Sequence, residues 1–84
     1  MKYCYITFRS VTPAQAAESL LRRTGVKCAI HRTPRWMEEQ GCGYSLRLPF
    51  PQGLQAAGVL NQHGIAFRKV YGQRENGTFE EMRL

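Results

Sequence analysis

Hydrophobic and polar residues alternate along the first segment of the chain. The residues from Cys4 to Phe8 are hydrophobic at every second position, and Tyr3 and Tyr5 fall on the opposite side. This two-residue period predicts a β-strand over residues 2–8 with one side buried. The same alternation predicts three further strands, at residues 26–30, 44–48 and 65–71.

The residues after the first strand carry the signals of a helix. Thr12 is the expected N-cap, Pro13 the expected first helical residue, and Gln15 completes a capping box. Gly25 is expected to take the left-handed conformation that ends a helix. The helix should bury an apolar stripe made of Ala14, Ala17, Leu20 and Leu21.

A second helix is predicted over residues 52–63 and should end at Gly64. Gly53 and Gly58 weaken it by about 1 kcal/mol each relative to alanine. Its expected apolar stripe consists of Leu54, Ala57 and Leu60.

A weak internal duplication relates the two halves of the chain. Residues 21–28 recur as residues 60–67, and the same spacing relates Tyr5 to Tyr44. Each copy reads as strand, helix, glycine and strand. The resulting β-α-β-β-α-β order predicts an α+β, ferredoxin-like fold: a four-stranded antiparallel sheet with two helices on one face. The first and third strands are then central, residues 1–72 form a single domain, and residues 73–84 form a polar C-terminal tail.

The face of this sheet away from the helices is a candidate surface for a ligand or a homodimer contact, and the pattern leaves open which of these, or water, it meets. It should carry Tyr3, Tyr5, Gly43, Ser45 and Arg47.

Net charge and cysteine content indicate which ligands and which cell compartment to expect. The net charge is +6 in 84 residues, and the excess of Lys and Arg lies in residues 1–71, so the folded part should attract anions of any kind. Three cysteines without a Cys-x-x-Cys pair favour a reducing compartment, the cytoplasm. The sequence shows neither a signal peptide nor a run of about 20 apolar residues, so no membrane partner is expected.

Cys42 is the cysteine whose setting favours chemistry. It lies between Gly41 and Gly43, which leave its sulfur approachable, whereas Cys4 and Cys28 fall in alternating apolar runs and should be buried. In the predicted topology Cys42 lies near the N-terminus of the first helix. The helix dipole there would lower the thiol pKa and favour the thiolate. The positive charges of Arg9 and Arg35 would act in the same direction. The alternative is a flexible turn with an incidental cysteine.

A resemblance adds to this interpretation. Residues 33–35 (TPR) and 42–48 (CGYSLRL) resemble the signature of the putative selenium/sulfur (Se/S) carrier protein-like family, a small bacterial domain, and the resemblance extends over residues 3–72. It implies that Cys42 holds sulfur or selenium as a persulfide or selenenylsulfide, with Arg35 as the matching loop arginine. The partners would be a donor and an acceptor protein, and the chain would be a covalent carrier rather than an ordinary enzyme.

Other candidate sites are weaker. His31 ends the second strand and can form a Cys/His pair with Cys42, but the sequence favours a solvated strand-end histidine, because no third residue that would orient it is evident. Trp36 can cover Cys42 or pack on its own domain. No metal is expected, because His31, Cys42 and His63 lack ligand spacing. No other cofactor is expected.

The rival interpretation is a small basic module that binds nucleic acid or another anionic ligand. Tyr3, Tyr5 and Arg47 on neighbouring central strands resemble a stacking platform for RNA. Residues 43–47 lack the aromatic-rich pattern of the RNA-recognition motif, so the sequence favours the carrier and does not favour nucleic acid as partner.

Overall fold

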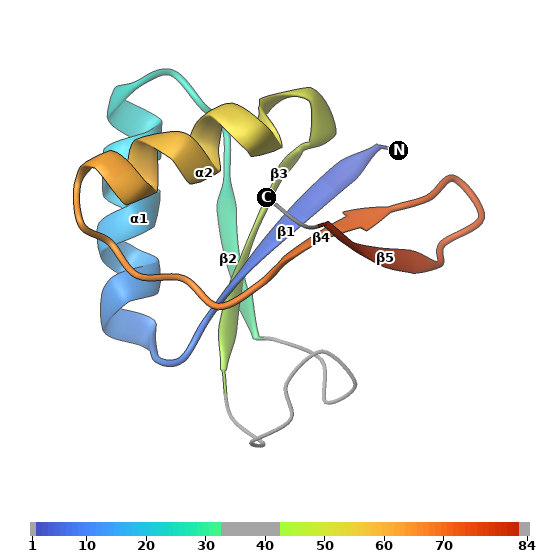
Figure 1. Cartoon of the computed structure of the whole chain (residues 1–84), viewed down its shortest axis with the longest axis horizontal. Helices are drawn as coiled ribbons and strands as arrows, with labels where there is room; N and C mark the ends of the chain where they lie inside the picture. Colours follow the sequence, from blue (N-terminus) through green and yellow to red (C-terminus); the bar gives the residue numbers. More distant parts are fainter. Residues whose placement is uncertain (1, 33–42, 83–84) are drawn as a thin grey trace.

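The computed structural model describes residues 2–32 and 43–82, which form an α+β fold. The described elements are β1 (Tyr3–Phe8), α1 (Val11–Arg23), β2 (Ala29–Arg32), β3 (Tyr44–Pro49), the 3-10 turn η1 (Phe50–Gln52), α2 (Gly53–Gln62), β4 (Val70–Gln73) and β5 (Phe79–Met82). The strands form one antiparallel sheet in the order β2-β3-β1-β4-β5, and both helices lie on the same side of it (Figure 1). As predicted, β1 and β3 are interior strands.

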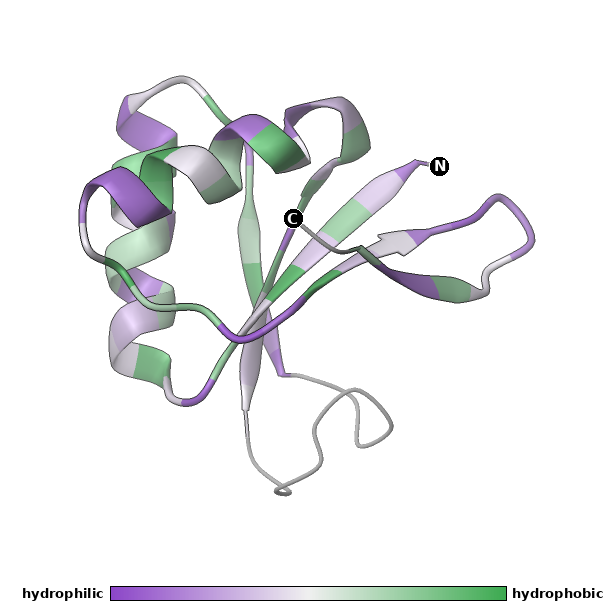
Figure 2. Cartoon of the chain, viewed as in Figure 1, coloured by the Kyte–Doolittle hydropathy of each residue, from purple (hydrophilic) through white to green (hydrophobic). Residues whose placement is uncertain are grey.

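The core lies between the sheet and the two helices. In the β1–β3 ladder Cys4 is opposite Leu48 and Ile6 is opposite Leu46, so these four side chains project from one face. All four are buried, and hydrophobic positions line the helix sides that face the sheet (Figure 2). The helices contribute Ala14, Ala17, Leu21, Ala56 and Leu60 to this core.

The duplication seen in the sequence reappears as two identical helix ends. The N–H of Val26 donates to Leu21 O at 2.9 Å, and the N–H of Ile65 donates to Leu60 O at the same distance. Each helix is followed by a glycine with positive φ: Gly25 at 88° and Gly64 at 70°. Only glycine adopts this conformation without strain, so both predicted helix stops are confirmed.

The predicted start of α1 is wrong by two residues. The helix begins at Val11, and the N-cap is Ser10, whose backbone is extended and whose side chain makes no capping hydrogen bond. The capping box of Thr12 and Gln15 is therefore not the start signal. Pro13 is the third helical residue, where its missing N–H costs nothing because the first four N–H groups have no partner within the helix.

The buried residues of the second helix differ from the predicted apolar stripe. Leu54 is 63% exposed, whereas Ala57 and Leu60 are buried as predicted, and Ala56 is buried as well. Gly53 lies against β1: a Cβ on this residue would be 2.6 Å from Cys4 Sγ. The close approach of α2 to the sheet therefore requires glycine at this position.

The strand predictions are wrong at two boundaries. The pattern placed the start of the second strand at residue 26, but β2 begins at Ala29. The fourth strand was predicted at 65–71, but β4 spans Val70–Gln73. Residues 65–69 follow the helix stop and hydrogen-bond to Thr7 of β1. The Thr7 N–H donates to Lys69 O at 2.8 Å, the Arg68 N–H donates to Thr7 O at 2.7 Å, and the Thr7 hydroxyl oxygen accepts from the Lys69 N–H at 3.0 Å.

The C-terminal residues also differ from expectation, because they add a fifth strand. β5 pairs antiparallel with β4, so the sheet has five strands and residues 79–82 are not a loose tail. The turn between them has Gly77 at a φ of 89°, and the Arg74 N–H donates to Thr78 O at 2.7 Å. The Asn76–Gly77 turn signal in the sequence was thus the mark of a hairpin.

Candidate functional site

The segments that the sequence predicts to form the site meet at one end of the sheet. Phe8, the last residue of β1, is opposite Tyr44, the first residue of β3, and Tyr44 is also opposite Arg32 at the end of β2. Helix α1 begins at Val11, three residues after Phe8. The prediction that the end of β1, the start of α1 and the start of β3 lie together is confirmed.

The predicted site residues divide between described and undescribed segments. Cys42, Arg35, Trp36 and Gly41 lie outside the described residues. Gly43, the residue before β3, is buried.

Arg9 is exposed in the turn between β1 and α1. With Ser10 and Pro13 it borders a hollow of about 410 Å³, whose other lining residues are Ala66, Phe67 and Arg68. Arg9 thus supplies positive charge at the predicted end of the sheet.

The positive end of the α1 dipole lacks a side-chain cap and a first-turn carboxylate. Its first turn contains no acidic residue, and the side chain of Ser10 does not cap it. The partial positive charge of the helix dipole is therefore not balanced by a carboxylate of the first turn. Such a helix end stabilises an anion placed near it.

The two described cysteines are unsuited to nucleophilic chemistry. Cys4 is fully buried, and burial raises the pKa of its thiol to about 11. Burial also raises the pKa of Cys28, the carboxylate of Glu18 adds to this effect, and Arg22 opposes it. Because the thiolate is the nucleophile, both thiols are held in the unreactive form at neutral pH. The prediction that these two cysteines are packing residues is confirmed.

His31 lies on β2 opposite Ser45, and its side chain is exposed. Its backbone carbonyl accepts a hydrogen bond from the Ser45 hydroxyl at 3.5 Å. Among residues 2–32 and 43–82, no group of three or more His, Cys, Asp or Glu side chains is placed to hold a metal ion. The pairing of His31 with Cys42 stays a prediction.

Arg47 is not at the same end of the sheet as Arg9. It is opposite Tyr5, three residues further from the Phe8 end of β1, which is about 10 Å along a strand. Its guanidinium lies over the Tyr3 ring, 4.8 Å from the ring centre. The register confirms that Tyr3, Tyr5, Ser45 and Arg47 share the face away from the helices. Arg47 therefore belongs to a second region of this face.

Sequence reasoning missed the residues that complete this second region. Phe79 on β5 packs edge-on against Tyr5 with ring centres 5.3 Å apart, and Gln73 on β4 is opposite Tyr3. Both were assigned to a tail, although the Asn76–Gly77 signal pointed to a hairpin that would return Phe79 to the sheet.

Comparisons with known proteins bear on the whole chain. No helix among the described residues is long and apolar enough to cross a membrane. No curated protein and no solved structure matches the chain. The model of one family, described as "putative Se/S carrier protein-like", matches residues 3–72. The match covers β1, β2, β3, both helices and all of β4 except its last residue, Gln73. The chain belongs to the putative Se/S carrier protein-like family.

Proposed function

We propose that the protein carries sulfur or selenium on Cys42 and passes it from a donor protein to an acceptor protein. The Cys42 thiolate attacks the outer sulfur of a donor persulfide. A new sulfur–sulfur bond forms on Cys42 as the donor bond breaks, and the donor leaves as a thiolate. The exchange needs no external oxidant or reductant. A donor selenenylsulfide reacts in the same way and leaves selenium on Cys42.

The second half of the relay is the same exchange in reverse. A nucleophile of the acceptor attacks the outer sulfur or selenium atom, and Cys42 departs as a thiolate. A low pKa of Cys42 assists this step, because a more acidic thiol is the better leaving group. The protein is therefore a covalent carrier and not an enzyme in the ordinary sense.

The observation that best supports the proposal is the burial of the other two cysteines, which raises the pKa of their thiols. The chain has three cysteines, and burial raises the pKa of both Cys4 and Cys28. Family membership suggests a carrier of sulfur or selenium, and a thiol is the group that forms a persulfide. Cys42 is the remaining thiol.

The described end of the sheet supports an anionic form of Cys42. Cys42 precedes Tyr44 by two residues, and Tyr44 is opposite Phe8 beside the uncapped start of α1. The positive pole of α1 and the Arg9 guanidinium both favour a negative charge here. Arg35 is proposed as a further positive charge from the loop, with Gly41 and Gly43 leaving room for the partner's sulfur.

Three finer assignments accompany this proposal. The fold is taken as ferredoxin-like with β5 added at the edge of the sheet. The cytoplasm, a reducing compartment, is the expected site of action because the described cysteines are free. Donor and acceptor are expected to be proteins that bring their own thiols to the Cys42 end.

The test is to incubate the protein with a persulfide donor and weigh it intact. The wild type should gain the mass of one sulfur atom, and Cys42→Ser should gain none. Cys28→Ala is the matched control, because it removes a buried thiol and should load like the wild type. Loading of Cys42→Ser to the wild-type extent, or no loading of the wild type, would refute the carrier role.

A second arm follows the alkylation rate of Cys42 against pH. The positive charges at this end should bring its pKa below about 8.5, the value of a free thiol. Alkylation that follows a pKa of 8.5 or above would remove the electrostatic part of the proposal.

A further inference from the structure

Two positive charges converge on one ring at the end of β1 remote from Phe8. The Lys2 ammonium lies 5.6 Å and the Arg47 guanidinium 4.8 Å from the centre of the Tyr3 ring. The two cations therefore lie no farther apart than these distances together. Within the described part of the chain neither has a carboxylate partner. An anion placed between them is attracted by both.

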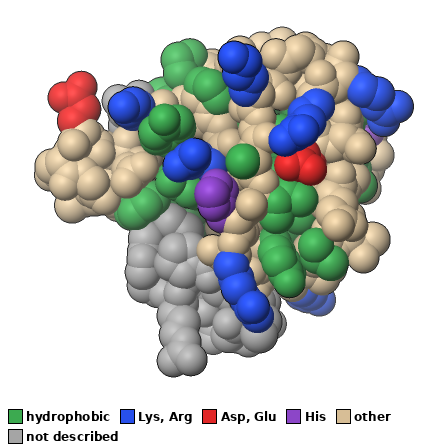
Figure 3. Space-filling view, turned by 180° about the vertical axis from the view of Figure 1, so that it is seen from behind, with side chains coloured by type: hydrophobic (Ala, Val, Ile, Leu, Met, Phe, Trp, Pro, Cys, Tyr) green, Lys and Arg blue, Asp and Glu red, His purple; other side chains and the backbone are tan. Residues whose placement is uncertain are grey.

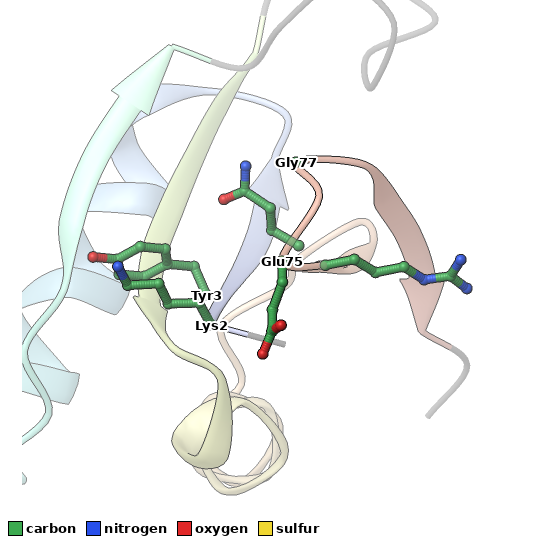
Figure 4. Close-up of a pocket in the computed structure, with 6 residues that line it drawn as sticks. Lys2, Tyr3, Glu75 and Gly77 are labelled. Carbon is green, nitrogen blue, oxygen red and sulfur yellow. The ribbon is translucent and has the colours of Figure 1, made fainter.

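A pocket of about 510 Å³ opens beside these groups. It lies between the start of β1 and the β4–β5 turn and is lined by Lys2, Tyr3, Gln73, Arg74, Glu75 and Gly77. Figure 4 shows Lys2 and Tyr3 on one side of it and Glu75 on the other. Of the two cations that line the pocket, Arg74 is engaged by Glu80 of β5 and Lys2 is available to a ligand. Arg47 does not line the pocket but lies beside it, over the Tyr3 ring.

The far side of the pocket offers hydrogen bonds of a different kind. The side-chain oxygen of Gln73 accepts from the Tyr5 hydroxyl at 3.5 Å, and the Gln73 amide NH₂ is a further donor. The Glu75 carboxylate is exposed and accepts hydrogen bonds from amino groups. A ligand here meets a donor and an acceptor in addition to the cations.

Three aromatic side chains on β1 and β5 lie beside the pocket. Tyr3, Gln73 and Phe79 are neighbours across three strands, and Tyr5 in the next row packs against Phe79. The rings of Tyr3, Tyr5 and Phe79 are each only partly buried. Because all three are fixed by contacts within the protein, little entropy is lost when a flat group packs on them.

We propose that this pocket and the sheet face beside it, with Arg47 and Phe79, bind a nucleotide. The phosphate contacts Lys2 and Arg47, the base packs on the exposed parts of the Tyr3 and Phe79 rings, and Gln73 and Glu75 hydrogen-bond its edge. A nucleotide carries an anion, a flat ring and polar ring edges in one molecule, as these three groups of side chains require. The site lies at the end of the sheet remote from Phe8, and its occupation does not depend on the proposed role of Cys42.

Charge argues against two other occupants. A second copy of the chain would bring two Lys2–Arg47 pairs and two net charges of +6 together, so self-association through this face is disfavoured. Basic side chains lie among hydrophobic ones on the side seen in Figure 3, where acidic ones are few. An acidic protein would satisfy the cations but would repel Glu75.

The experiment titrates the ¹⁵N-labelled full chain with AMP and with CMP, and separately with pyrophosphate. We expect the amides of Tyr3, Gln73 and Phe79 to shift with either nucleotide. Arg47→Gln should weaken binding about tenfold through loss of a charge-assisted phosphate contact. Tyr3→Leu keeps an apolar side chain but removes the ring and should also weaken it. Lys27→Gln removes one exposed charge elsewhere and should bind like the wild type.

A single-stranded octanucleotide identifies the source of the nucleotide. Binding at least tenfold tighter than AMP and falling with salt shows that the site takes a nucleic acid strand, and equal affinities show that it takes a free nucleotide. Each of these results supports the proposal. Cys42→Ser should bind as the wild type does, so loss of sulfur loading and loss of nucleotide binding are separate results.

Four results would overturn the proposal. They are pyrophosphate binding as tightly as AMP with no effect of Tyr3→Leu, equal weakening by Lys27→Gln and Arg47→Gln, binding of polyglutamate but not of nucleotides, and no amide shifts at millimolar nucleotide. The dispersed amide spectrum of each variant verifies that it is folded.

Discussion

Single contacts decide which residues the chain tolerates, and the contact of Gly53 with Cys4 is the tightest case. Cys4 is fully buried beneath α2, and a Cβ at Gly53 would lie 2.6 Å from its sulfur. Gly58, in the same helix, has no atom within 4 Å of the corresponding position. The sequence predicts the same helix-weakening cost for Gly53 and Gly58, but the structure has room for a side chain only at Gly58.

Gly53→Ala should lower the free energy of unfolding by about 1 to 3 kcal/mol, because the new methyl group overpacks the core. Gly58→Ala should raise it by about 0.5 to 1 kcal/mol, because alanine is the better helix former and its site is open. Urea denaturation of both variants measures this. Placing Gly53→Ala in a Cys4→Ala background should reduce its cost, and equal costs in the two backgrounds would show that the sulfur is not the obstacle.

The raised pKa of Cys4 links stability to pH. The native state favours the neutral thiol, since its pKa is raised from 9.0 to about 11 by burial. This contribution is fully present below pH 9 and is lost as the pH rises towards 11. Between pH 8 and pH 10 the wild type should lose about 1 kcal/mol more than Cys4→Ala in chemical denaturation. Parallel losses in the two proteins would contradict the burial of an un-ionised thiol.

At the scale of elements, β5 is the part that the hydrophobic pattern did not reveal. Phe79, Met82 and Leu84 form too short a pattern to identify a strand, and the pairing of β5 depends on β4 and on the turn at Gly77. Strand β4 was misplaced for a related reason: the alternation begins at residue 65, but backbone pairing with β1 is present only from Arg68 and β4 itself begins at Val70. Pairing partners, not local pattern, set both boundaries.

Phe79→Ala should lower the free energy of unfolding by about 1 to 2 kcal/mol, because it removes the edge-on contact with Tyr5 that holds β5 to the sheet. Leu54→Ala is the control at an exposed apolar side chain: Leu54 is 63% exposed and its truncation should cost less than about 0.5 kcal/mol. Thermal unfolding compares them. If the two variants unfold alike, residues 79–82 contribute as little as a loose tail would.

At the scale of the whole molecule, the internal duplication was the most informative part of the sequence. It predicted both helices, their glycine stops at Gly25 and Gly64, and the meeting of β1, α1 and β3 at one end. It could not predict the start of α1, because Ser10 acts through its extended backbone and not through a side-chain cap. Nor could it predict the pocket beside Tyr3, which needs the β4–β5 hairpin.

The two ends of the sheet thus have separate proposed roles. The end at Phe8 and Tyr44 has the uncapped helix start and Arg9, and Cys42 precedes Tyr44 by two residues in the sequence. The end at Tyr3 has the paired cations and the pocket. The carrier role depends on the first end alone.

Cyanolysis tests the carrier role most directly, because cyanide attacks the outer sulfur of a persulfide and releases thiocyanate and the free thiol. The protein is loaded with a persulfide donor, separated from it and treated with cyanide. We predict one thiocyanate per chain from the wild type and from Cys28→Ala, and none from Cys42→Ser. Equal thiocyanate from Cys42→Ser, or none from the loaded wild type, would contradict a transferable sulfur on Cys42.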